Sequence, residues 1–137
     1  GNGTLKTWSK TQTVIALSTG EAELAAIVKG STEALGIKSL LEDFGISVSL
    51  TICSDASAAI GMVGREGLGK VRHLAVADLW VQAKRASGEL SFVKVDGASN
   101  PSDALTKGIS GDKLARDIAQ LGFVRLDGRS SLMPRLI

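Results

Sequence analysis

The sequence contains a single cysteine, Cys53, and a single histidine, His73. One cysteine excludes a disulfide within the chain, and these two residues lack the ligand spacing of a zinc site. We therefore expect Cys53 to be a small buried hydrophobic residue. The chain also lacks an apolar run of the roughly 20 residues that cross a bilayer, and a basic segment followed by a hydrophobic one at its N-terminus. We expect no membrane association and an intracellular protein, cytoplasmic or nuclear, that is not secreted.

The chain has 137 residues, of which 44% are hydrophobic, and its net charge is only +2. This length suits one compact domain. The charge is unevenly divided, because residues 1–68 carry five basic and seven acidic residues, whereas residues 69–137 carry eleven and seven. The second half could therefore face a polyanion, or its charges form an ordinary solvated surface. The candidates for phosphate contact are Lys70, Arg72, Lys84, Arg85, Lys94 and Lys107.

Alternation of apolar and polar residues predicts a strand over residues 4–10. Ser18 and Glu21 then have the spacing of a capping box, which predicts a helix that runs to about Phe44 and ends at Gly45. A break near Gly36 is compatible with this pattern.

The rest of the chain alternates between helical and strand patterns, which indicates an α/β sheet with crossovers. In the helix over residues 72–86 we expect Val76, Leu79, Trp80 and Ala83 to face inward. The elements expected after residue 45 are a strand over 48–53, a helix over 56–63, the helix over 72–86, a strand over 90–95, a helix opening at Asn100–Asp103, and a helix carrying Leu114, Ile118 and Leu121 that ends at Gly122.

Three acidic residues occupy positions where an acid is costly: Glu23 beside the apolar face of a helix, Asp55 after an apolar strand, and Asp103 at a helix opening. Carboxylates that a fold gathers repel one another, so such a group usually holds divalent cations. Each residue has a simpler role open to it. Glu23 and Asp103 could be first-turn acids that complement a helix dipole, and Asp55 could be an N-cap.

Four segments together resemble the ribonuclease H domain of copia-type retrotransposon polyproteins. They are Thr13–Leu24, Ile52–Ile60, Lys70–Leu74 and Ser102–Lys107. Each segment is a weak signal alone, but four in the family's order are specific, and their order and spacing agree over residues 5–123.

The resemblance implies hydrolysis of the RNA strand of an RNA/DNA hybrid on a five-stranded mixed sheet with flanking helices. It implies that Glu23, Asp55 and Asp103 are three of four carboxylates that hold two Mg²⁺ ions, with Mn²⁺ as a possible substitute. Hard cations take oxygen ligands, and two metal ions can activate water without a protein nucleophile. The residues expected to bind nucleic acid are Lys70, Arg72, His73 and Lys107, with a structural role as the alternative for His73.

Glu21 and Glu23 lie about equally far from the centre of the apolar stripe, on opposite flanks, so periodicity does not choose between them. The resemblance favours Glu23, because the segment that begins there is similar to the family's catalytic helix. Glu21 already has a role in the capping box.

The chain departs from the family pattern at its start. The family begins with a strand that carries the first catalytic Asp and then a second strand, and these two lie between the third and fourth strands in a sheet of order 3-2-1-4-5. We expect residues 1–123 to be a partial, N-terminally truncated domain of a longer polyprotein that includes a segment such as a reverse transcriptase, and residues 124–137 to be a loosely ordered tail. A non-catalytic nucleic-acid-binding or scaffolding remnant, or an unrelated α/β domain whose acids are caps, are the alternatives.

Overall fold

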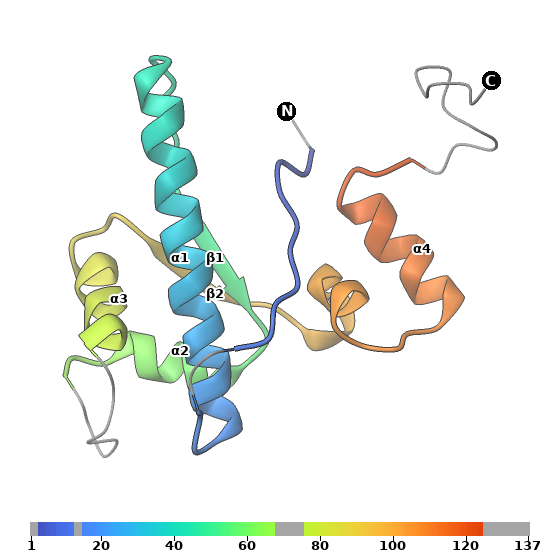
Figure 1. The fold of residues 1–137 in the computed structure, drawn as a ribbon, viewed down its shortest axis with the longest axis horizontal. Helices are drawn as coiled ribbons and strands as arrows, with labels where there is room; N and C mark the ends of the chain where they lie inside the picture. Colours follow the sequence, from blue (N-terminus) through green and yellow to red (C-terminus); the bar gives the residue numbers. More distant parts are fainter. Residues whose placement is uncertain (1–2, 13–14, 68–75, 125–137) are drawn as a thin grey trace, which may run out of the picture. The chain divides into compact units, whose positions relative to one another are not determined.

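A computed structural model of the chain describes residues 3–12, 15–67 and 76–124 (Figure 1). The chain divides into two compact units. Residues 11–98 form the first, which we call the sheet unit, and residues 1–10 with 99–137 form the second, which we call the terminal unit.

The sheet unit is built around two parallel strands, which confirms the predicted α/β architecture with a crossover. Ile52 pairs with Phe92 in the register, and two further backbone bonds, Ser91 N–H to Leu50 O and Val95 N–H to Ser54 O, both 3.0 Å, extend the ladder beyond the strands. The carboxyl ends of both strands therefore lie at one edge of the sheet. The elements are α1 (Thr19–Asp43), β1 (Thr51–Ser54), α2 (Ser57–Gly64), α3 (Val76–Ala86) and β2 (Ser91–Lys94).

The start of α1 is set by the predicted cap. Ser18 Oγ accepts a hydrogen bond from Glu21 N–H at 3.3 Å, and Glu21 Oε2 accepts one from Leu17 N–H at 2.9 Å. The capping box is therefore confirmed, with the glutamate reaching one residue further back than Ser18 itself. The helix continues through Gly36 and ends before Gly45, whose φ of 76° suits glycine.

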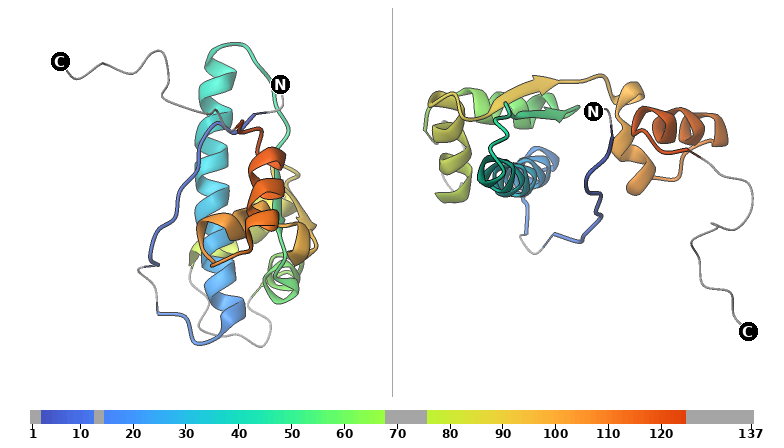
Figure 2. Two further views of the ribbon diagram at one scale, coloured as in Figure 1. Left: turned by 90° about the vertical axis from the view of Figure 1, so that its right-hand side faces the viewer. Right: turned by 90° about the horizontal axis from the view of Figure 1, so that it is seen from above.

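The core of the sheet unit is formed by α1, α2 and α3, and one face of the sheet packs against it through Ile52 and Phe92. Figure 2 (right) shows α1 end-on, on one side of the two strands. The opposite face carries Cys53 and Val93, and both are exposed. The prediction that Cys53 is buried is wrong, because no described element covers this second face. The buried cluster consists of Leu24, Ile27, Ala59, Met62, Val63 and Val81.

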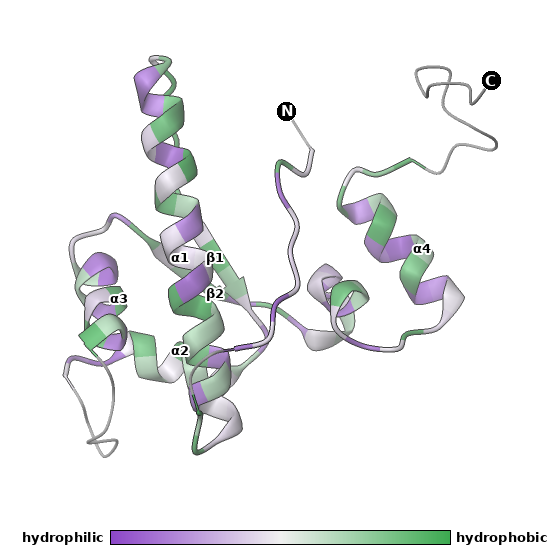
Figure 3. Ribbon diagram, in the orientation of Figure 1, coloured by the Kyte–Doolittle hydropathy of each residue, from purple (hydrophilic) through white to green (hydrophobic). Residues whose placement is uncertain are grey.

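Hydrophobic residues continue along α1 beyond this core (Figure 3). Leu40, Phe44 and Ile46 are exposed near the helix end. The apolar stripe that predicts the helix is therefore longer than the part of it that the described residues bury.

Helix α3 has the predicted orientation only in part. Trp80 packs against the buried cluster and Leu79 is half-buried, as predicted. The predictions for Val76, which is 82% exposed, and for Ala83, which is also exposed, are wrong, and Val81 and Gln82 are buried instead. Gln82 Nε2 donates to Met62 O at 2.9 Å and Gly67 O at 3.1 Å, and its Oε1 accepts from Gly67 N–H at 2.9 Å. A glutamine whose amide is satisfied in this way can be buried. Hydropathy periodicity does not detect such partners, which explains the wrong prediction.

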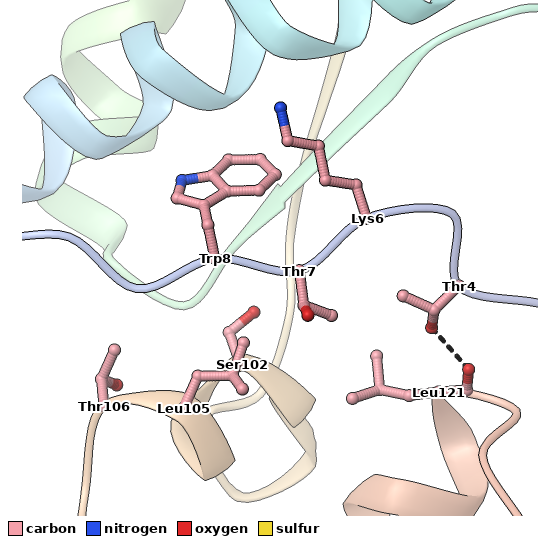
Figure 4. A pocket seen from close by; sticks show the side chains of 8 residues that line it. All are labelled: Thr4, Lys6, Thr7, Trp8, Ser102, Leu105, Thr106 and Leu121. Atoms are coloured by element: carbon pink, nitrogen blue, oxygen red, sulfur yellow. Dashed lines mark hydrogen bonds between the residues drawn. The ribbon is translucent and has the colours of Figure 1, made fainter. Parts of the chain in front are cut away.

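The terminal unit contains the last residue of η1 (Gly97–Ser99), then η2 (Pro101–Leu105) and α4 (Gly111–Gln120). The helix opening predicted at Asn100–Asp103 is confirmed, since Asn100 caps η2, although η2 is a 3₁₀-helix. The predicted last helix is α4, and its cap is Ser110, which sequence reading did not name. The strand predicted over residues 4–10 is wrong. A strand needs a partner with free backbone groups, and in this unit the described partners are helical segments that bond internally. Thr4 instead donates its hydroxyl to Leu121 O at 2.5 Å (Figure 4).

Two predictions fall on residues outside the described part of the chain. They are the helix start at Arg72 and the loosely ordered tail beyond Val124. No helix in the described segments is both long and apolar enough to cross a lipid bilayer.

We predict that Gln82→Leu lowers the free energy of unfolding by about 2 kcal/mol, because it leaves Met62 O and the Gly67 peptide groups without their partner. The matched control is Gln120→Leu, because Gln120 is an exposed residue of α4. This substitution should change the free energy of unfolding by less than about 0.5 kcal/mol. Urea unfolding followed by circular dichroism measures both. Equal effects of the two substitutions would contradict the role given to Gln82.

Candidate functional site

Asp55 directly follows β1 at the carboxyl end of the sheet and is half-buried. It does not take the N-cap role that was its alternative, because the cap residue of α2 is Ala56 and no side chain caps that helix. The turn is instead supported by Ser54, whose Oγ accepts a hydrogen bond from Ala56 N–H at 3.2 Å. The Asp55 carboxylate is therefore not required to begin α2.

The chain that follows β2 approaches Asp55 closely at Gly97. A Cβ on Gly97 would lie 3.3 Å from Asp55 Oδ2. The carboxylate thus rests against the backbone that follows the second strand. Sequence reading did not single out Gly97, because its importance depends on strand pairing across about 40 residues.

Glu23 lies in the early part of α1 and is half-buried. The same end of α1 packs tightly on α2: a Cβ on Gly20 would lie 3.1 Å from Ala58 Cβ. Since α2 begins just after Asp55, Glu23 and Asp55 belong to elements that meet at the carboxyl end of the sheet (Figure 1). Of the two glutamates, Glu21 is engaged in the helix cap. Glu23 is therefore the candidate ligand.

Asp103 lies in the terminal unit, in the first turn of η2, and is only 9% exposed. Its Oδ1 is 2.6 Å from Lys107 Nζ, and its Oδ2 is 3.8 Å from Lys113 Nζ. Both carboxylate oxygens therefore face an ammonium group. The first-turn position proposed as the alternative is confirmed, and the ion pairs add a structural role for this acid.

Lys113 joins Asp103 to a second buried acid that sequence reading missed. Its Nζ lies 2.9 Å from Asp117 Oδ2 and donates to Asn100 O at 3.3 Å. Asp117 is only 2% exposed, so its charge depends on this partner. The available signal was the i, i+4 spacing of Lys113 and Asp117 on one helix.

The sheet unit therefore contains Glu23 and Asp55, and the terminal unit contains Asp103. Within residues 3–12, 15–67 and 76–124, no three His, Cys, Asp or Glu side chains gather as a group that could hold a metal ion. The centre formed by all three carboxylates stays a prediction.

The predicted nucleic-acid contacts are only partly within the described residues. Lys70, Arg72 and His73 lie outside them. Lys107 pairs with Asp103, and Lys84 pairs with Glu89 at 2.7 Å. Hydrogen bonds from Lys84 and Ser87 lower the pKa of Glu89. These contacts within the chain already use part of the positive charge that was a candidate for phosphate binding.

The terminal unit also has a pocket of about 290 Å³ beside the segment at residues 4–8 (Figure 4). Lys6 Nζ lies 5.6 Å from the centre of the Trp8 ring, a cation–π contact. No acidic residue is among the described residues that line the pocket. Its lining residues are Thr4, Lys6, Thr7, Trp8, Ser102, Leu105, Thr106 and Leu121.

Comparison with known proteins finds a similarity to the retrovirus-related Pol polyprotein from transposon TNT 1-94 of Nicotiana tabacum, at 27% identity over 113 residues. The similar region covers 81% of this chain and 8% of that polyprotein, so the chain spans about a twelfth of the relative's length. No protein-family model matches the chain, and no solved structure matches it. The similarity supports an origin in a retroelement polyprotein.

We predict that Lys113→Met destabilises the terminal unit by about 3 kcal/mol, since it leaves the buried Asp117 charge unpaired. Lys29→Met is the matched control, because Lys29 and Glu33 form an i, i+4 pair at 2.7 Å in which the lysine is exposed. Lys29→Met should lower the free energy of unfolding by at most about 0.5 kcal/mol. The double variant Lys113→Met/Asp117→Leu should recover much of the loss in thermal unfolding, and no recovery would contradict the pairing.

Proposed function

We propose that this chain is part of a retroelement ribonuclease H that hydrolyses the RNA strand of an RNA/DNA hybrid with divalent cations. The similarity to a Pol polyprotein and the order of the acidic segments both support this function. The observation that carries it is the position of Asp55 at the carboxyl end of a parallel strand, next to the helical elements that hold Glu23. Ligands and catalytic groups in open α/β sheets lie at this edge.

Glu23 and Asp55 are the residues that would hold the cations. Both are half-buried carboxylates, and oxygen is the ligand that Mg²⁺ and Mn²⁺ prefer. When bound, a pair of such ions activates a water molecule and stabilises the leaving 3′-oxygen. Asp103 would join them through a carboxylate whose Oδ1 already lies 2.6 Å from Lys107 Nζ.

The proposed activity belongs to a larger polyprotein than this chain. In the described residues β1 pairs with β2 alone, so β1 has one edge without a partner strand. We propose that a strand with a further catalytic Asp, from a preceding part of the polyprotein, pairs there, as the family's sheet order implies. A reverse transcriptase segment is the proposed neighbour, and the hybrid it makes is the proposed substrate.

Selection of RNA requires a contact to the 2′-hydroxyl, normally across the wide minor groove of the hybrid. The basic residues between positions 70 and 107 are the proposed contacts to the phosphates. They would give binding that weakens as salt rises.

One observation favours a second function, a non-catalytic nucleic-acid-binding or scaffolding remnant. Both oxygens of Asp103 face lysines, and the pair with Lys107 needs no metal ion. In such a remnant Asp103 would be retained for the stability of the terminal unit rather than for catalysis.

We predict that a polyprotein segment containing this chain and the residues preceding it cleaves the RNA strand of a labelled hybrid in Mg²⁺. Glu23→Gln and Asp55→Asn should each lower the rate at least about 100-fold, the scale on which lost transition-state charge stabilisation acts. Glu21→Gln is the matched control, since Glu21 serves the cap of α1, and its rate should change by less than about threefold.

Gel-shift binding of the same hybrid separates the two functions. Binding without cleavage by the unmodified segment would support the remnant. Cleavage that survives Asp55→Asn would contradict the proposed site.

A further inference from the structure

We infer that Gly97 is a positioning residue that fixes the Asp55 carboxylate by having no side chain. The inference deepens the proposed function and rests on it for its catalytic meaning. Its structural content, that the backbone at Gly97 is the surface on which the carboxylate rests, depends only on the sheet unit.

The strand pairing brings these two residues together. Ser54 pairs with Lys94 at the end of the register, and Val95 N–H donates to Ser54 O at 3.0 Å beyond it. The chain after β2 therefore continues alongside the chain after β1 for at least one more residue. Asp55 directly follows Ser54, and Gly97 lies two residues after Val95.

The turn after β2 holds the Gly97 backbone in place. Asp96 Oδ1 accepts a hydrogen bond from Ala98 N–H at 3.2 Å, which closes an Asx turn around Gly97. Gly97 also begins the short helix η1. Its position is thus fixed from both sides, by the ladder before it and by the turn after it.

The three atoms nearest to a Cβ placed on Gly97 all belong to the Asp55 side chain. A Cβ there would meet Asp55 Oδ2 at 3.3 Å, Asp55 Cβ at 3.9 Å and Asp55 Cγ at 4.0 Å. Gly20 differs, because a Cβ there would meet carbon atoms of Ala58 and Met62, so its lack of a side chain serves helix packing. At Gly97 the missing side chain instead makes room for a carboxylate.

Backbone conformation does not require glycine at position 97. The glycines with positive φ are Gly45, Gly67, Gly88 and Gly122 among the described residues. Alanine at position 97 is therefore compatible with the backbone, and its main effect is the contact with Oδ2. A displacement of a few tenths of an ångström approaches the roughly 0.5 Å within which the groups of a functional site are held.

The test compares Gly97→Ala with Gly108→Ala, a loop glycine at which a Cβ would meet nothing within 4 Å. In the full chain, the ¹³Cγ resonance and the χ1 couplings of Asp55 should change in Gly97→Ala and stay unchanged in Gly108→Ala. In the hydrolysing polyprotein segment, Gly97→Ala should raise the Mg²⁺ concentration needed for half-maximal rate about tenfold, with a melting temperature within about 2 °C of the unmodified segment.

A second comparison covers the case in which Gly97→Ala lowers stability. Asp55→Ala removes Oδ2 and Cγ, so adding Gly97→Ala to it should then change the melting temperature by less than half as much as in the unmodified chain. Equal shifts in the two backgrounds, or unchanged Asp55 resonances in Gly97→Ala, would overturn the inference. A segment that fails to cleave the hybrid contradicts the proposed function instead, since the resonances and melting temperatures still decide the role of Gly97.

Discussion

The parallel pairing of β1 with β2 is the constraint on which the sheet unit depends. The strands are four residues each, yet the ladder continues through Val95 N–H to Ser54 O, and both chains then turn at the same edge. Because the carboxyl ends of parallel strands lie at the same edge of a sheet, the residues directly after each strand are brought to this edge. The position of Asp55 against Gly97 is a direct consequence of that pairing.

Buried polar side chains stabilise each of the two units in a different way. In the sheet unit the neutral amide of Gln82 satisfies backbone groups at Met62 and Gly67, so a buried polar residue costs little. In the terminal unit the buried polar groups are charged, and Lys113 neutralises Asp117 while lying 3.8 Å from Asp103. Loss of one partner is therefore more costly in the terminal unit than loss of one hydrogen bond in the sheet unit.

Signals that act over a few residues predicted the structure best. The Ser18 cap, the end of α1 before Gly45, both strands and the Asn100 cap follow from nearby residues, and all are confirmed. The wrong predictions concern partners that are distant in sequence. The segment at 4–10 alternates like a strand but has no strand beside it among the described residues of its unit, and Cys53 faces the side of the sheet that no described element of the sheet unit covers. Likewise, Asp55 was found as an acid after an apolar strand and Asp103 as an acid at a helix opening, whereas the closeness of Gly97 to Asp55 depends on the pairing of two distant strands.

The competition at Asp103 links the fold to the proposed chemistry. Lys107 and a divalent cation would compete for the charge of one carboxylate, because Asp103 Oδ1 already lies 2.6 Å from Lys107 Nζ. A single carboxylate near the protein surface gives a cation little advantage over an ammonium group that is tethered four residues away. The balance changes when several carboxylates share the ion, because their mutual repulsion is relieved only by the higher charge. In the proposed site Asp103 would therefore act as a ligand together with Glu23, Asp55 and a further acid, whereas in the terminal unit it pairs with Lys107.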